Sequence, residues 1–153
     1  MEKYNNQITL VIESRSQNES LARAVVAAFI APLDPDLDIL MDIKTAVSEA
    51  VTNAIIHGYK NMVGEIVLTM SLKDKELYIS VTDQGIGISS IQQAMEPLYT
   101  TSSPEMERAG MGFTVMESFM DKVTVTSSPD QGTTVEMIKD LSSKERAMAW
   151  TKP

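Results

Sequence analysis

The sequence predicts an α/β protein, a two-layer sandwich in which helices cover one face of a mixed, mainly antiparallel sheet. Apolar residues change between helical and strand spacing in the order β-α-α-β-β-α-loop-α-β-β. Adjacent strands are joined by short turns, as in hairpins. The helices are too few to cover both faces of a sheet. Together these observations favour one sheet with one helical layer.

The chain has 153 residues, enough for one domain, and we expect a core over about 8–141 and a frayed tail over 142–153. It contains no cysteine, which excludes disulfides and thiolate metal sites. The net charge of −8 argues against direct binding to nucleic acid, which needs neutralising Lys and Arg. No secretory signal or membrane-spanning segment is recognisable. We therefore expect a cytoplasmic protein without a membrane segment.

The first strand and helix are predicted within residues 8–32. Residues 8–13 alternate apolar and polar side chains, as in a strand. Ser16 and Glu19 have the spacing of a capping box, which would begin the next helix. This helix should end before Pro32. Its apolar stripe would consist of Leu21, Val25 and Phe29.

The longest predicted helix runs from about residue 36 to residue 57. Its apolar stripe consists of Leu40, Ile43, Val47, Ala50, Val51 and Ala54. A second, polar line on the same helix contains Asp42, Thr45, Glu49 and Asn53. Gly58 is expected at the C′ position, where a positive φ angle costs glycine nothing.

The segments after this helix begin with a hairpin. Residues 66–72 and 77–82 alternate at strand spacing around a polar turn at 73–75. Residues 89–96 predict a short helix, followed by a loop from residue 97 to residue 112.

The last elements are a helix and two strands. Residues 113–120 return to helical spacing, with Phe113, Met116 and Met120 on one face. Strands are predicted at 123–125 and 133–138, joined by a turn at 129–132.

Three polar residues are spaced by four in this sequence, so a helix places them along one edge. Asn53 offers a neutral amide oxygen suited to Mg²⁺ that also contacts phosphates. Glu49 has the chemistry of a base that accepts a proton during γ-phosphoryl transfer. Taken singly, each is more often an ordinary residue on a helix surface. His57, the sole histidine, fits a structural contact at the helix end better than a metal site.

Asp83 follows the second strand of the hairpin and begins the pattern Asp-x-Gly-x-Gly. Its carboxylate could accept a hydrogen bond from an exocyclic amine such as adenine N6. Gly85 and Gly87 would let the backbone pass close to a flat base. Such a short pattern also occurs in ordinary turns.

Gly110 and Gly112 precede the helix expected at 113–120, where backbone N–H groups would favour a phosphate. Arg108 could fork onto a γ-phosphate. Thr133 could place its hydroxyl near the base or near Asp83. A surface arginine and a plain turn are the alternative interpretations.

The motifs ExxxNAxxHG, DxGxG, GMGF and GTT, in this order, resemble the superfamily of gyrase, heat-shock chaperone, histidine kinase and MutL ATPases, which has the Bergerat ATP-binding fold. The glutamate that opens the asparagine motif, in a short chain without a dimerisation domain, is similar to the anti-sigma serine kinases. The segments SQNES, SEAVTNAIIHGY, PLYTT, ERAGMGF, MESFMD and SSPDQGTT resemble sporulation members of that family. The similarity covers nearly the whole chain, from about Ile8 to Leu141.

The resemblance implies that the chain binds ATP or ADP, with Asn53 as the Mg²⁺ ligand, Glu49 as the catalytic base and Asp83 in contact with adenine. Arg108 would act on the phosphates from a lid over about 97–110. The other implied nucleotide contacts are Gly85, Gly87, Thr100, Thr101, Gly110, Met111, Gly112 and Thr133. Family members of this type phosphorylate a serine of an anti-anti-sigma partner. These family members also hold a sigma factor inactive, and they usually do so as homodimers. For this chain, the resemblance implies a sporulation sigma factor of the sigma F type.

Two other functions stay open at this point. A nucleotide-gated sigma-binding module without kinase activity needs Asn53 and the glycines, but it needs no base at Glu49. A detached histidine-kinase catalytic domain would phosphorylate a histidine on a separate dimerisation domain.

Overall fold

In the part of the chain that the structure describes, five strands form one sheet in the order β1-β2-β3-β5-β4, and all four pairings are antiparallel. The computed structural model describes residues 5–59, 62–87 and 104–142, with the backbone alone over 104–110. The strands are β1 (Asn5–Glu13), β2 (Glu65–Lys73), β3 (Glu76–Asp83), β4 (Lys122–Ser127) and β5 (Thr133–Asp140). The predicted fold class is confirmed, and the described pairings narrow the expected mixed sheet to an antiparallel one.

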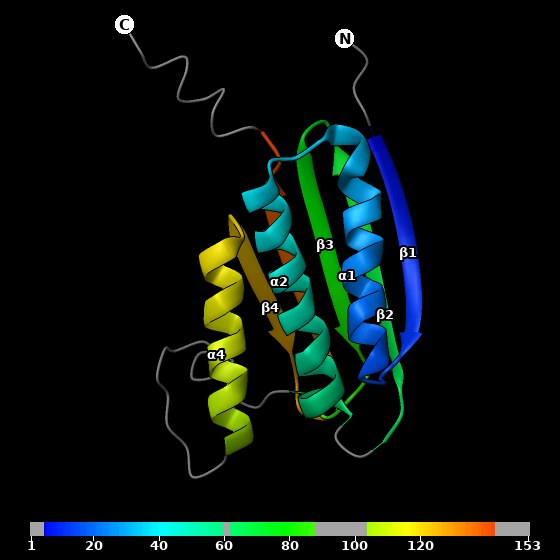
Figure 1. The fold of residues 1–153 in the computed structure, drawn as a ribbon. Coiled ribbons are helices and arrows are strands. Elements are labelled where there is room, and N and C mark those ends of the chain that lie inside the picture. Colours follow the sequence, from blue (N-terminus) through cyan, green and yellow to red (C-terminus); the bar gives the residue numbers. More distant parts are fainter. Residues whose placement is uncertain (1–4, 60–61, 88–103, 143–153) are drawn as a thin grey trace, which may run out of the picture.

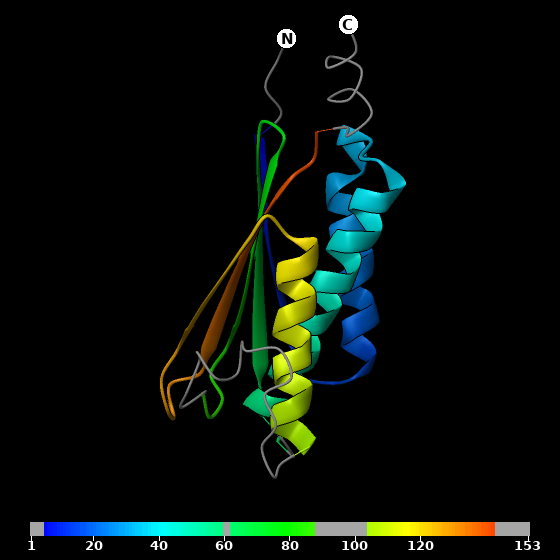
Figure 2. The same cartoon turned by 90° about the vertical axis from the view of Figure 1, so that its left-hand side faces the viewer.

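Three helices of the described residues form the second layer, on one face of the sheet (Figure 1 and Figure 2). They are α1 (Gln17–Ile30), α2 (Leu37–Asn53) and α4 (Pro104–Phe119), with a 3₁₀ turn η1 (Ala31–Leu33) after α1 and a π-helical turn η2 (Ala54–Gly58) after α2. Helix α2 packs between α1 and α4. None of the described helices is long and apolar enough to cross a membrane.

The core lies between the two layers. Alternate residues of β2 and β3 are buried on the helical face of the sheet: Ile66, Leu68, Met70, Leu72, Leu77, Ile79 and Val81. The predicted stripe of α2 packs on them, because every member is buried except Leu40, which is half-buried against the core. The predicted face of the last helix is confirmed as well, since Phe113, Met116 and Met120 are buried.

The predicted stripe of α1 is partly wrong. Leu21 is 46% exposed, and the buried residues are Ala22, Val26, Phe29 and Ile30. Steps of four residues rotate around a helix by about 40° each, because a turn has 3.6 residues. A stripe drawn at 21, 25 and 29 therefore starts outside the core at Leu21, is partly buried against it at Val25 and is buried at Phe29.

Two predicted helix ends are also wrong. Helix α1 begins after Ser16, but this residue has helical backbone angles (φ −57°, ψ −34°) and its side chain makes no cap hydrogen bond. An N-cap residue has extended angles, so the capping box with Glu19 does not form. Gly58 is not a C′ residue with positive φ, since the chain continues from α2 through η2 and the described glycines with positive φ are Gly87 and Gly132.

The loop predicted up to Gly112 is wrong in its second half, because α4 begins at Pro104. Proline suits the first position of a helix, and Glu105 and Glu107 suit its positive N-terminal end. Each glycine costs a helix only about 1 kcal/mol, so the two glycines do not prevent it from forming. The helix predicted at 89–96 and the tail beyond 142 lie outside the described residues.

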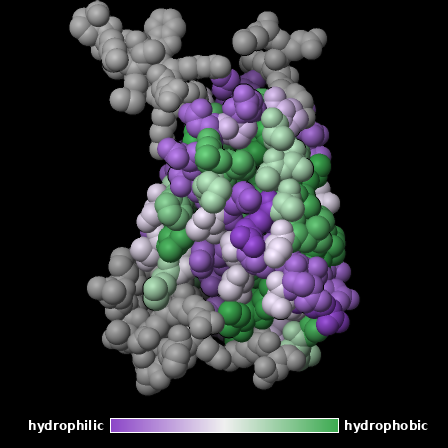
Figure 3. Space-filling view, in the orientation of Figure 1, coloured by the Kyte–Doolittle hydropathy of each residue, from purple (hydrophilic) through white to green (hydrophobic). Residues whose placement is uncertain are grey.

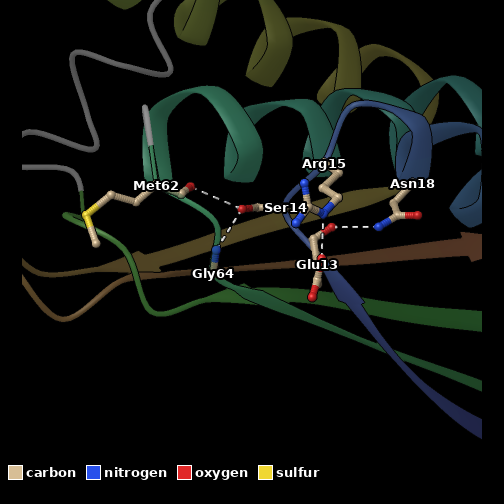
Figure 4. A network of polar contacts seen from close by, with 6 residues as sticks. All are labelled: Glu13, Ser14, Arg15, Asn18, Met62 and Gly64. Atoms are coloured by element: carbon tan, nitrogen blue, oxygen red, sulfur yellow. Dashed lines mark hydrogen bonds and ion pairs between the residues drawn. The ribbon is translucent and has the colours of Figure 1, made fainter.

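Ser14 connects the end of β1 to the start of β2 (Figure 4). Its backbone N–H donates to the carbonyl of Gly64 at 2.8 Å, and its hydroxyl accepts from the N–H of Gly64 at 2.9 Å. Asn18 Nδ2 donates to the carbonyl of Glu13 at 2.9 Å. These bonds fix the first turn of α1 against the edge of the sheet.

Candidate functional site

Glu49 and Asn53 lie on the side of α2 that faces α4. A Cβ atom on Gly112 would lie 3.0 Å from Asn53 Nδ2 and 3.1 Å from Glu49 Oε2. The missing side chain of Gly112 therefore lets α4 approach both polar groups. The structure brings these three predicted site residues together.

The Asn53 side chain is buried, with 9% of the residue exposed. Its Nδ2 atom has no hydrogen-bond partner among the described residues. A buried amide normally satisfies its donors, and its oxygen and nitrogen ends can exchange by a flip about χ2. The arrangement fits an amide that binds a ligand, with its oxygen available to a hard cation. Within the described ranges, no three His, Cys, Asp or Glu side chains cluster as metal ligands, so such a cation would take most of its ligands from phosphate and water.

Glu49 is half-buried beside Asn53. Burial raises the pKa of the Glu49 carboxyl, and the negative charge of Glu19 raises it further. A carboxylate with a raised pKa holds a proton more readily, which is the property required of a general base.

Asp83 is the last residue of β3, and it is 5% exposed. Burial raises the pKa of its carboxyl, whereas hydrogen bonds from the backbone N–H groups of Gly85 and Thr133 act in the opposite direction. The bond from Gly85 to Asp83 Oδ1 measures 2.9 Å. Asp83 is therefore held by the turn that follows it and by the neighbouring strand β5.

The chain after Asp83 lies directly on the end of η2. A Cβ atom on Gly85 would lie 1.9 Å from the carbonyl oxygen of Gly58, and one on Gly58 would lie 2.8 Å from Asp83 Oδ1. The N–H of Ile86 donates to the same Gly58 carbonyl at 2.9 Å. Glycine at position 58 thus makes room for the Asp83 carboxylate, which is a different reason from the predicted one.

Thr133 is placed opposite Asp83 in the β3–β5 register. Its hydroxyl lies 2.8 Å from the hydroxyl of Ser127, so it reaches Asp83 by its backbone N–H. Gly87 comes four residues after Asp83, and a Cβ atom on it would lie 2.0 Å from the carbonyl oxygen of Ser128. The start of β5, the end of β4 and the end of β3 therefore meet at this edge.

The other residues predicted for the site lie in different parts of the chain, and some are outside the described residues. Arg108 and Gly110 lie within α4, in the part where only the backbone is described. Because α4 begins at Pro104, Gly110 and Gly112 do not precede a helix N-terminus as predicted. Met111 is 66% exposed on the same helix. Thr100 and Thr101 lie outside the described residues. His57 is half-buried in η2, at the helix end where we predicted a structural role for it.

Several site-supporting residues were missed. The hydroxyl of Tyr59 accepts from the N–H of Gln84 at 2.7 Å and donates to the carbonyl of Glu65 at 2.6 Å, which holds the segment after Asp83. Nothing in the sequence around Tyr59 indicates this long-range bridge. We predicted only a capping-box role for Glu19, although Arg23 follows it at the spacing of a helical ion pair.

Comparisons with known proteins show the family to which this chain belongs. A family model described as the histidine kinase-like ATPase domain matches residues 12–139. The anti-sigma F factor of Bacillus velezensis is 53% identical over 92% of this chain and 96% of its own length. That of Clostridium kluyveri is 56% identical over 92% of this chain and 98% of its own length.

A solved structure shows the same fold. The crystal structure of the RsbU and RsbW domains of Rv1364c from Mycobacterium tuberculosis matches 90% of this chain and 33% of that chain, with a TM-score of 0.65 and 22% identity. Structure and sequence relatives therefore agree, and the chain belongs to the histidine kinase-like ATPase domain family and, within it, to the anti-sigma F factor family.

Proposed function

We propose that this chain is an anti-sigma factor that binds and inhibits a sporulation sigma factor of the sigma F type and uses Mg-ATP to phosphorylate a serine of an anti-anti-sigma partner. The observation that carries the kinase proposal is the placement of Glu49 and Asn53 side by side against Gly112. The printed names of the relatives support the sigma-factor part.

Each site residue has a defined task in this proposal. Asp83 accepts a hydrogen bond from the adenine amine, and the amide oxygen of Asn53 holds Mg²⁺, which neutralises phosphate charge when bound. Glu49 accepts the proton of the serine hydroxyl as the serine oxygen bonds to the γ-phosphorus and the bond to the β-phosphate oxygen breaks. ADP is the leaving group. Arg108 is assigned to the γ-phosphate.

The other nucleotide contacts in this proposal come from the glycines and the lid: Gly85, Gly87, Thr100, Thr101, Gly110, Met111, Gly112 and Thr133. We also propose that the protein is a cytoplasmic homodimer that does not bind nucleic acid directly. The net charge of −8 supports the last point, since phosphate-binding surfaces carry excess Lys and Arg.

The direct test mixes the protein with γ-labelled ATP, Mg²⁺ and a purified anti-anti-sigma F protein, followed by phosphoamino-acid analysis. Label on serine supports the proposal. Nucleotide binding without any transfer would instead support a nucleotide-gated sigma-binding module. Acid-labile phosphohistidine would support a detached histidine-kinase domain.

Sigma binding is tested separately, by the affinity for a sigma F protein with ATP and with ADP. Tight binding supports the anti-sigma role, and no binding in either nucleotide state would overturn it.

A further inference from the structure

Glu19 lies in the first turn of α1, where it contacts α2. On the helical side of the molecule, hydrophilic residues gather along the junction of these two helices (Figure 3). The Glu19 side chain is 19% exposed, and its Oε1 atom accepts a short hydrogen bond from the hydroxyl of Ser48. The same oxygen lies 3.0 Å from Arg23 Nε. One carboxylate oxygen thus connects α1 to the residue that precedes Glu49.

Two helices border the turn of α2 that carries Glu49. On the α4 side, a Cβ atom on Gly112 would lie 3.1 Å from Glu49 Oε2. On the α1 side, Glu19 bonds to Ser48, and its negative charge raises the pKa of Glu49. The turn of α2 that carries Glu49 is therefore bounded by α4 and by the pair formed by Glu19 and Ser48.

The local role of Glu19 does not account for this arrangement. Its spacing from Ser16 suits a capping box, but Ser16 makes no side-chain cap and Glu19 bonds across to α2. Arg23 holds the same carboxylate oxygen that accepts the bond from Ser48. The Glu19 side chain is therefore bonded to the residue of α2 that precedes Glu49, and not to the start of its own helix. This bond between the two helices favours a role at the site.

We propose that Glu19 is a positioning residue for phosphoryl transfer, fixing through Ser48 the turn of α2 that aims the Glu49 carboxylate at the face of α4. This inference rests on the proposed kinase function, and it assigns Glu19 no contact with the nucleotide. Glu49 still takes the serine proton, and Glu19 acts only through it.

The test compares Glu19→Ala, Ser48→Ala and Glu19→Gln by single-turnover transfer at saturating Mg-ATP and saturating anti-anti-sigma F protein. We expect Glu19→Ala to lower the transfer rate by roughly 10- to 100-fold, as for a displaced catalytic group, with the Kd for ATP unchanged within about twofold. Ser48→Ala should act in the same direction, and the double variant should be no slower than Glu19→Ala. Glu19→Gln keeps an acceptor for Ser48 and should recover most of the rate.

The decisive measurement repeats Glu19→Ala in a Glu49→Gln background. If Glu19 acts through Glu49, the added substitution leaves the residual rate unchanged. A loss of the same size in both backgrounds, or a higher KM for the partner with an unchanged rate at saturation, overturns the proposal and assigns Glu19 to folding or docking. Glu117→Ala, which removes an exposed glutamate of α4, is the control.

Two failures are separable in this design. If wild-type protein transfers no phosphate, the kinase function itself fails. If wild type transfers and Glu19→Ala transfers equally fast, only the positioning role of Glu19 is overturned. Thermal unfolding of each variant shows whether it is folded, and Glu19→Gln provides the comparison if Glu19→Ala is not.

Discussion

Gly112 of α4 lies so close to Asn53 of α2 that a Cβ atom on the glycine would come within 3.0 Å of the amide nitrogen. The contact is tight, so the Asn53 side chain would have to shift by a few tenths of an ångström to make room for a Cβ atom. The space that Gly112 leaves open is therefore part of the site, because it sets the position of the amide that we assign to Mg²⁺.

Gly112→Ala should separate stability from nucleotide binding. Alanine favours a helix by about 1 kcal/mol over glycine, so the free energy of unfolding should stay equal or rise. The displaced Asn53 should lower ATP affinity by about tenfold, equal to about 1.4 kcal/mol. Calorimetry of Mg-ATP binding and urea unfolding measure the two quantities. Ser118→Ala on the exposed side of α4 is the matched control, and equal ATP affinity in both variants would contradict the assignment.

Glu49→Gln should bind ATP normally and lose transfer, because glutamine keeps the shape of the side chain without a basic oxygen. We expect the rate of serine phosphorylation to fall by roughly 10²- to 10⁴-fold, the usual contribution of a general base. Transfer at the wild-type rate would show that Glu49 is not the base and would favour another acceptor for the proton.

The pH dependence of transfer should reflect the environment of Glu49. Burial and the charge of Glu19 raise its pKa above the ordinary value of 4.5, and the base works only when deprotonated. The transfer rate should therefore decline as the pH falls from neutral, before the pH reaches that ordinary value. Rates measured by rapid quench at several pH values test this, and Glu49→Gln should lack this acid limb.

Asp83→Asn should weaken nucleotide binding without destabilising the protein. The folded-state pKa of Asp83 is raised by burial, so the folded state binds more protons than the unfolded state between the two pKa values. Stability from this group is thus lost as the pH rises through that window, and the charged carboxylate is a net cost at neutral pH. Asparagine removes the charge and keeps an acceptor for Gly85.

For Asp83→Asn we expect a melting temperature equal to or above that of wild type at pH 7, with reduced affinity for ATP and ADP alike. Asp38→Asn on the exposed side of α2 controls for the change in net charge. A lower melting temperature would mean that the buried carboxylate stabilises the fold.

Lys139→Met should affect stability alone. Lys139 is 7% exposed, and its Nζ donates to the carbonyl of Phe119 at 2.6 Å, with Asp42 and Asp121 carboxylates 3.9 Å away. Methionine keeps the apolar stem but leaves the carbonyl without this donor, which should cost about 1–3 kcal/mol. Urea unfolding should show a lower midpoint at an unchanged m-value, and the Kd for ATP should not change.

The spacing of apolar and polar residues correctly predicted those strands and helix faces that depend on neighbouring residues in the sequence. The alternation around Asp74 and Lys75 gave both strands of the β2–β3 hairpin, and the spacing of Glu49 and Asn53 gave their common face. The start of α4 was missed because Gly112 was interpreted as a loop residue, whereas its close contact with α2 is a tertiary property.

The side-chain partners of the site were missed for a similar reason. Glu19 has two possible partners, the Ser16 backbone and Ser48, and only the packing of α1 on α2 decides between them. The role of Gly58 likewise depends on where Asp83 comes to lie, which no spacing within the η2 segment specifies. Local sequence thus identifies which groups can act, and long-range packing decides which neighbours they meet.

The antiparallel register of β3 has a consequence for mutation away from the site. Side chains alternate between the two faces of a strand, so a slip of one residue would turn Asp83 away from the helices and onto the opposite side of the sheet. The tight turn at Asp74, whose φ is +57°, sets that register from the far end of the hairpin. We therefore expect insertions or deletions in this distant turn to abolish the adenine contact that we propose for Asp83, although every residue of the candidate site stays unchanged in the sequence.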